Sequence, residues 1–196
     1  MSDRQTQIVQ AARAIVAERG VGALSVRSTA ARAGIGASTL RHYFPTQQAL
    51  FDAVVGAAFH DELDDLRIAD TRVPAGQRLT ECMAQFLPPS ENDIPGLLNW
   101  LTMYTAALGP ERTEQGTRAL TSLTALGRQR VHGWLEVLHA DDLLRHADLS
   151  RHTTVLMTYL DGLCLALLAP GPGGITVEQA RGHLRELIDA MVVAPS

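Results

Sequence analysis

The stretch SVRSTAARAGIGASTLRHYFPTQQAL, residues 25–50, contains two short helix-forming segments joined by a turn that holds glycine. Ser25 is a favoured N-cap residue, and it predicts a first helix that ends where Gly34 can adopt the left-handed conformation. A second short helix is expected over residues 37–44. Two short helices connected by such a turn predict a helix-turn-helix.

Helices as short as these need packing partners, because helix nucleation is costly in isolation. The sequence offers two partners, an amphipathic helix over about 3–19 and a following helix from Gln47 to about Ile68. The apolar side chains that can face the small core between these helices are Val26, Ala30, Ala33, Leu40 and Phe44. The remaining faces of the second short helix are then left for contact with another molecule.

The rest of the sequence has helical periodicity, and no segment has the alternating pattern of a β-strand. Helices are expected over about 75–86, 94–108, 111–139 and 148–168, and a last helix begins at the capping box of Thr176 and Gln179. The 148–168 segment is apolar nearly all round, so we expect both of its sides to be buried. The prediction is an all-α chain of about nine helices.

We expect two domains, a helix-turn-helix domain over 1–46 and a larger helical domain over 47–196. The chain of 196 residues has a formal charge of −4 at pH 7, but the charge is unevenly placed. Residues 1–50 hold six arginines against two acidic residues, a net +4, whereas residues 51–196 hold eleven arginines against nineteen acidic residues, a net −8. A basic end on an acidic body is typical of a nucleic-acid-reading domain attached to a domain with another role.

Cys82 and Cys164 lie far apart, in neither a metal-binding nor a redox spacing, which indicates reduced core thiols in a cytoplasmic protein. The most apolar segment, residues 155–169, is too short to span a bilayer and contains Asp161. The first twenty residues lack the apolar run of a signal peptide. A cytoplasmic protein that makes no membrane contact is therefore expected.

The sequence offers no constellation for catalysis. It contains no nucleophile elbow, no metal-ligand spacing and no pair of carboxylates in a setting suited to acid–base chemistry. The glycine-rich loop at 170–174 lacks the Gly-Lys-Ser/Thr ending of a phosphate-binding loop and follows no predicted strand. An all-helical enzyme is therefore the disfavoured alternative, and neither a cofactor nor a metal is expected.

Four groups of residues within the helix-turn-helix carry a family resemblance. They are Ala33-Gly34-Ile35-Gly36, Ser38-Thr39-Leu40-Arg41, His42-Tyr43-Phe44-Pro45 and Thr46-Gln47. This stretch resembles the DNA-binding motif of the tetracycline-repressor (TetR) family, whose pattern is Ala-Gly-Val-Ser, Gly-Thr-Leu-Tyr, aromatic-His-Phe and Ser-Lys. The chain departs from the pattern at Gly36, Ser38, Arg41 and Gln47, the last replacing a lysine that would pair with phosphate.

The resemblance implies that the helix-turn-helix binds double-stranded DNA. The residues expected to contact DNA are Ser25, Arg27, Gly36, Ala37, Ser38, Thr39, Arg41, His42, Tyr43, Thr46 and Gln47. Arg41 can bind guanine O6 and N7 through its forked guanidinium, or it can bind a phosphate. The resemblance implies that the Tyr43 hydroxyl donates to a phosphate, with a purely packed ring as the alternative. His42 can bond a phosphate or a base edge, or cap a helix end.

For the larger domain, the resemblance implies a homodimer and a small-molecule effector. The last two helices of TetR-family chains pair with their copies in a second subunit, and Gly162 and Ala166 are small residues, spaced four apart, that permit such close approach. The expected function is repression of transcription from a pseudo-palindromic operator, with release by the effector. The alternative is a helical ligand-binding or interaction module with weak DNA affinity, which Gln47 in place of lysine favours.

The effector site is expected among the fourth to eighth helices. Its candidates are Met83, Phe86, Trp100, Met103, Tyr104, Trp134, Met157 and Asp161, each of which can equally belong to the core. Polar groups are available from Asn99, Thr102, Gln129, His132 and Thr158. The segments 86–108 and 160–163 also resemble the C-terminal domain of the choline-responsive betaine-pathway repressor.

Overall fold

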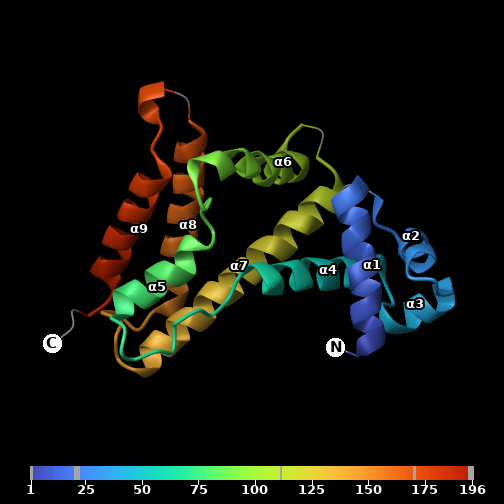
Figure 1. Cartoon of the computed structure of the whole chain (residues 1–196), viewed down its shortest axis with the longest axis horizontal. Helices are drawn as coiled ribbons and strands as arrows, with labels where there is room; N and C mark the ends of the chain where they lie inside the picture. Colours follow the sequence, from blue (N-terminus) through green and yellow to red (C-terminus); the bar gives the residue numbers. More distant parts are fainter. Residues whose placement is uncertain (1, 20–22, 111, 170, 194–196) are drawn as a thin grey trace.

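The computed structural model describes residues 2–19, 23–110, 112–169 and 171–193, and in these ranges it is helical apart from connecting loops and one isolated bridge. The α-helices are α1 (Asp3–Arg19), α2 (Val26–Arg32), α3 (Ala37–Tyr43), α4 (Gln47–Glu62), α5 (Ala75–Ala84), α6 (Leu97–Leu108), α7 (Glu114–Ala140), α8 (Leu149–Leu168) and α9 (Val177–Met191). Two 3₁₀ helices, η2 (Glu91–Gly96) and η3 (Gly171–Gly173), lie in the connections. The predicted all-α class with an N-terminal helix-turn-helix is confirmed (Figure 1).

Helices α1 to α3 and the first half of α4 form a small N-terminal bundle, the head, at one end of the molecule (Figure 1). Its core contains Ile8 from α1, Leu40 from α3 and Leu50 from α4, all fully buried. Gly34 ends the turn after α2 with a φ of +65°, the left-handed conformation that glycine adopts without strain. The two short helices are therefore held by packing on α1 and α4, as the sequence predicts.

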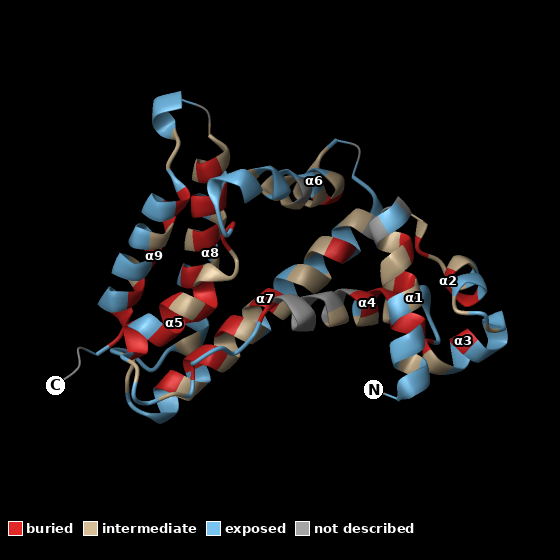
Figure 2. Cartoon of the chain, in the orientation of Figure 1, coloured by how far each residue is buried: buried red, intermediate tan, exposed pale blue. Residues whose placement is uncertain are grey.

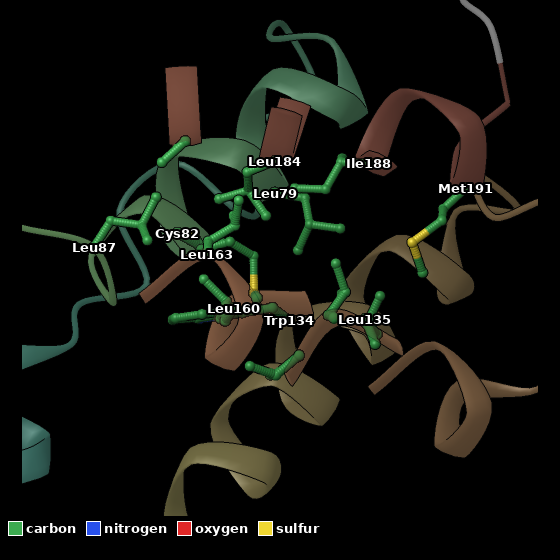
Figure 3. Packing of buried hydrophobic residues seen from close by; sticks show 14 of the residues in the cluster. Leu79, Cys82, Leu87, Trp134, Leu135, Leu160, Leu163, Leu184, Ile188 and Met191 are labelled. Atoms are coloured by element: carbon green, nitrogen blue, oxygen red, sulfur yellow. The ribbon is translucent and has the colours of Figure 1, made fainter. Parts of the chain in front are cut away.

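The larger part of the chain, the body, has a separate core built by α5, α7, α8 and α9 (Figure 3). Its fully buried members include Leu79, Leu135 and Leu184, and the Trp134 ring lies among them with 1% of its surface exposed. Helix α7 has 27 residues, which at 1.5 Å each makes it about 40 Å long. Its first half reaches the head, where Ala119 joins the head core, so α7 spans both cores (Figure 1).

Helix α4 ends at Glu62, and the predicted continuation to Ile68 is wrong. Other helices hold the backbone that follows α4. The Asp64 amide donates to Gln85 Oε1 and Gln85 Nε2 donates back to the Asp64 carbonyl, both at 2.8 Å. Leu66 has a φ of +42°, which a helix does not permit. These tertiary contacts stop the helix where the local sequence alone would continue it.

Two further predictions of helical structure need correction. Residues 94–96 end a 3₁₀ helix that contains Pro95, and α6 begins only at Leu97. Helix α8 is buried on one face only. Leu156, Leu160, Leu163 and Leu167 belong to the body core, whereas Val155 and Leu165 are 40% and 51% exposed. The expectation of burial on both sides is therefore wrong for a single chain.

Candidate functional site

The N-terminus of α2 and that of α4 are each fixed by a side-chain cap. Ser25 Oγ accepts from the Ser28 amide at 3.0 Å, and the Ser28 hydroxyl accepts from the Ser25 amide at the same distance, which completes a capping box. Thr46 Oγ1 accepts from the Ala49 amide at 3.0 Å. Ser25 and Thr46, both expected at the DNA interface, therefore fix the starts of α2 and α4, the helices before and after α3.

Helix α3 presents one continuous exposed face. Leu40 is fully buried and Phe44, its C-cap, is 6% exposed, so the helix is anchored along one side. Figure 2 colours most of α3 as exposed, and its exposed residues are Ala37, Ser38, Thr39, Arg41 and His42. A helix of 7 residues with a free polar face of this kind can enter the major groove of DNA.

Some of the residues predicted to contact DNA are partly buried or bonded within the head. Tyr43 is half-buried and its ring meets His42 edge to face, with 5.2 Å between the ring centroids. Gln47 Nε2 donates to the Leu24 carbonyl at 3.0 Å, so this amide is engaged within the head. Gly36, the N-cap of α3, makes no side-chain cap, which leaves the first amides of α3 open.

Arginines on α2 and α3 contribute exposed positive charge to the helix-turn-helix. The Arg32 guanidinium pairs with Glu18 through two hydrogen bonds of 2.5 and 2.8 Å, which neutralises one of the two acidic residues of the head. Arg27 at the start of α2 and Arg41 on α3 are exposed. The exposed face of α3 is therefore flanked by cationic side chains, as a surface that meets phosphates requires.

The effector candidates fall into two groups in the body. Met83 and Trp134 are buried in the core, and Phe86 meets the Trp134 ring edge to face with 6.2 Å between centroids. Met103 and Met157 are half-buried. The side chain of Asn99 lies outside the described part of the structure, and Thr102, Gln129 and Thr158 are exposed while His132 is half-buried. Packing in the body core explains the positions of Met83, Trp134, Phe86 and Met157 without a ligand.

The second group is a cluster of Trp100, Tyr104 and Asp161 where α6 meets α8. The Trp100 and Tyr104 rings lie 4.7 Å apart between centroids, and the Tyr104 hydroxyl donates to Asp161 Oδ2 at 3.5 Å. Burial raises the pKa of the Asp161 carboxyl, although the Tyr104 hydroxyl partly opposes the shift. Burial, followed by the nearby Asp161 charge, raises the pKa of Tyr104. The cluster is therefore a partly buried acid bonded to Tyr104, whose ring in turn packs on that of Trp100.

Sequence reasoning missed a contact that fastens the linker after α4 to α7. Asp65 Oδ1 accepts from Trp134 Nε1 at 2.8 Å and lies 3.3 Å from Arg130 Nη1. Arg130 also donates to the Leu63 carbonyl, and its guanidinium lies 5.8 Å from the Trp134 ring centroid. We call this the Asp65 contact. Asp65 and Trp134 are 69 positions apart, so no local pattern could have indicated it.

The exposed face of α8 forms an open, apolar groove with α9. The groove has a volume of about 600 Å³ and is lined by Thr154, Val155, Thr158, Tyr159, Gly162, Leu163, Ala166, Ile175 and His183. A Cβ added at Gly162 would have no neighbour within 4 Å, so the helix backbone there is open to another molecule. The groove therefore offers an apolar surface on which another apolar surface could pack.

Membrane-spanning helices and metal-binding clusters are both absent from the described residues. No helix among them is long and apolar enough to cross a membrane. In the same residues, no group of three or more histidine, cysteine, aspartate or glutamate side chains is placed to hold a metal ion. Burial raises the pKa of the Cys82 thiol to about 12 and that of the Cys164 thiol to about 11, so neither is a reactive thiolate near neutral pH.

The sequence matches two family models in different parts of the chain. Residues 8–54, which contain the helix-turn-helix, match the model described as bacterial regulatory proteins, tetR family. Residues 94–193, from η2 to the end of α9, match the model described as the RecC C-terminal domain. The first match covers the whole exposed face of α3, and the second covers α6 to α9, including the part of α7 that packs on the head.

Relatives and solved structures extend across nearly the whole chain. The HTH-type transcriptional regulator PksA of Bacillus subtilis (strain 168) is 26% identical over 171 residues, which is 85% of this chain and 80% of that protein. A Rhodococcus sp. structure assigned to the TetR-family transcriptional regulators is 21% identical, with a TM-score of 0.63 over 98% of this chain and 100% of its own. A Saccharomonospora viridis structure, solved in complex with choline, is 22% identical with a TM-score of 0.56 over 100% of both chains.

Proposed function

We propose that this chain is a DNA-binding transcriptional regulator of the TetR family, that it represses transcription as a homodimer, and that a small organic cation releases it from its operator. The observation that carries the proposal is the exposed polar face of α3, which is anchored by the buried Leu40 and flanked by exposed arginines. A family match over 8–54 coincides with this surface. The fold and the family favour a regulator over an enzyme.

The dimer forms through α8 and α9. The apolar groove between them has the small Gly162 at its centre, and the exposed Val155 and Leu165 lie on the same face of α8. Burying this face against its own copy would remove the apolar surface from water, which favours association. Two copies related by a two-fold axis present two α3 helices to one pseudo-palindromic site, with half-sites about 34–36 Å apart or somewhat more.

The effector binds at the cluster of Trp100, Tyr104 and Asp161. An organic cation there gains attraction from the faces of two aromatic rings and from the carboxylate, which burial otherwise holds back from ionisation. The similar Saccharomonospora viridis protein was solved with choline, a cation of this class. A quaternary ammonium compound is therefore the effector chemistry that this cluster fits.

Release from DNA follows a shift between two conformations of the dimer. The effector must bind more tightly to the conformation in which the two α3 helices are wrongly spaced for the operator. Helix α4 carries the head, and the Asp65 contact fastens the linker after α4 to α7 in the body. Movement of α7 relative to α8 therefore reaches the head through α4 and through the α7 residues that pack on it.

The experiment that tests the proposal is selection of bound duplexes from a random DNA pool, followed by titration of the complex with choline. The expected result is a two-fold-symmetric site whose complex dissociates as choline rises, with tetramethylammonium as a second cation and glycerol as an uncharged control. No enrichment over the pool after unfolding and refolding, which removes carried-over ligand, contradicts DNA reading. Enrichment without cation-dependent release refutes the effector class alone.

A further inference from the structure

A second cleft lies at the end of the body remote from the head. It has a volume of about 1100 Å³ and is bounded by the loop 71–74, the first turns of α5, the connection after α7 and the last turns of α9. None of Trp100, Tyr104 and Asp161 lines it, so it is separate from the proposed effector site. The proposed function gives this cleft no role.

A buried arginine in the wall of this cleft lacks adequate partners. Arg78, on α5, is only 2% exposed. Its Nη1 donates to the Ile68 carbonyl at 2.8 Å, and the nearest carboxylate oxygen, Asp141 Oδ2, is 4.0 Å away, beyond hydrogen-bond reach. Its Nε is buried and has no acceptor among the described residues.

Arg78 has no hydrogen-bonded carboxylate among the described residues, because Asp70 is bonded to Arg72 instead, and that bond, together with the nearby Arg78 charge, lowers the pKa of the Asp70 carboxyl. Burying a guanidinium without a bonded counter-ion is energetically costly, so buried arginines are normally paired and fully hydrogen-bonded. Asp141 does not fill the role, because its side chain is 43% exposed and therefore keeps much of its solvation. An oxyanion that entered the cleft and bonded the guanidinium edge would supply what the chain does not.

The cleft is also lined by two other acidic residues, Glu81, which has a partner outside the cleft, and the exposed Asp189. Glu81 pairs with Arg67 and accepts from Gln77 at 3.0 Å, and the first of these contacts lowers the pKa of its carboxyl. Asp189 lies against the first turn of α5, where a Cβ on Gly76 would come within 2.4 Å of its Oδ1. The Asp189 carboxylate therefore lies near the N-terminal end of α5, where the helix dipole favours a negative charge.

The cleft also has an apolar wall made by Val73, Pro74, Leu143 and Val192. We propose that the cleft is a binding site for a small organic carboxylate, whose oxygens bond Arg78 and whose apolar body lies on this wall. The forked geometry of guanidinium suits a planar carboxylate, and the volume accommodates a body of several carbons. The site is lined by residues of α5 and α9. It also touches the linker after α4, residues 63–74, because Arg78 is bonded to the Ile68 carbonyl.

The test is calorimetric titration of the full chain with hexanoate and with hexan-1-ol, which share an apolar body and differ in the carboxylate. Hexanoate is expected to bind saturably at one site per chain, about tenfold or more tightly than hexan-1-ol, as a charge-assisted hydrogen bond implies. Equal affinity for the two probes, or no saturable binding of hexanoate, overturns the proposal.

A pair of variants locates the site without removing Arg78, whose loss could unfold the chain. Asp141→Asn removes the carboxylate nearest to the guanidinium and is expected to tighten hexanoate binding by about two- to fivefold, the effect of one partly exposed charge. Asp142→Asn makes the same charge change one position away, outside the cleft lining, at a φ of +56° that asparagine tolerates. It is expected to leave the affinity unchanged, and an equal effect of the two variants refutes the assignment to Arg78.

Discussion

Arg41 is the residue of α3 best suited to read a base. It is exposed, it replaces a tyrosine of the family pattern, and its guanidinium can bond guanine O6 and N7 together. We expect Arg41→Ala to relax the preference at one position in each half-site, at a loss of about 1–3 kcal/mol of discrimination. Selection of bound duplexes with both proteins measures this directly.

Arg27→Ala provides the matched control, because Arg27 is also an exposed arginine of the helix-turn-helix but stands at the start of α2. Its loss should weaken all sequences alike and reduce the salt dependence of binding by about one phosphate contact. If Arg41→Ala behaves in this same uniform way, Arg41 is a phosphate contact and another residue reads the operator.

Asp161 gives stability a dependence on pH with a defined sign. Burial raises the pKa of its carboxyl in the folded chain above the unfolded value, so the folded chain binds this proton more tightly. Stability therefore falls as pH rises from the unfolded value through the folded one, and the whole penalty is present above the folded value. Asp161→Asn, which cannot ionise, should be the more stable protein at neutral pH.

The stability difference should be below about 1 kcal/mol, because solvent screens a carboxyl that is only partly buried. It should shrink as pH falls and vanish below the unfolded pKa of aspartate. Denaturant unfolding of both proteins across this range measures it, with no ligand present. A stability advantage of Asp161→Asn that is constant with pH would show that ionisation is not its cause.

At the scale of the helices, the sequence predicts what local chemistry decides. The caps at Ser25 and Thr176 and the left-handed Gly34 are found where their residue types indicate. The end of α4 is not predictable in this way, because Gln85 and Trp134, distant in sequence, hold the backbone and side chain of residues 64 and 65. The exposed face of α8 is not predictable either, because an apolar pattern does not distinguish a core-facing side from an exposed one.

In the candidate site, too, local patterns predict some features and only tertiary contacts determine the others. The side chains of α3 could be predicted, since one buried leucine at position 40 determines which of its faces is free. The Asp65 contact and the cleft beside Arg78 could not, because each joins residues from helices that only the tertiary fold brings together. Sequence patterns therefore indicate the reading surface better than they indicate ligand sites.

The capping box of α9 offers a test of local chemistry. Thr176 Oγ1 accepts from the Gln179 amide at 3.1 Å, and Gln179 Oε1 accepts from the Thr176 amide at 2.8 Å. Thr176→Ala should lower the free energy of unfolding by about 0.5–2 kcal/mol, as loss of an N-cap does. Thr121→Ala, the same change at an exposed position inside α7, should be nearly neutral in the same urea titration. Equal losses in the two variants would contradict a capping role.

Across the whole molecule, α7 is the element shared by head and body. Ala119 is part of the head core, with Leu123 and Leu126 packed against it, and Trp134 and Leu138 are part of the body core. The hydroxyl of Ser122 also donates to Asp52 Oδ1 on α4 at 2.8 Å. Head and body are therefore joined by α4, by the linker after it and by one continuous helix, which gives a change in the body a direct path to the head.

The dimer proposed through α8 and α9 can be tested with one side chain. Leu165, on α8, is 51% exposed in the single chain, on the same face as Val155 and Gly162. Leu165→Arg should leave the body core intact and yet place a charge in the apolar dimer surface. We expect sedimentation to show a monomer, and affinity for the two-fold-symmetric site to fall by about 10²-fold or more, because linked half-site binding is lost. Leu108→Arg alters a leucine that is 67% exposed at the end of α6, and should change neither property. A dimer that persists in Leu165→Arg with undiminished affinity would place the subunit contact elsewhere on the body.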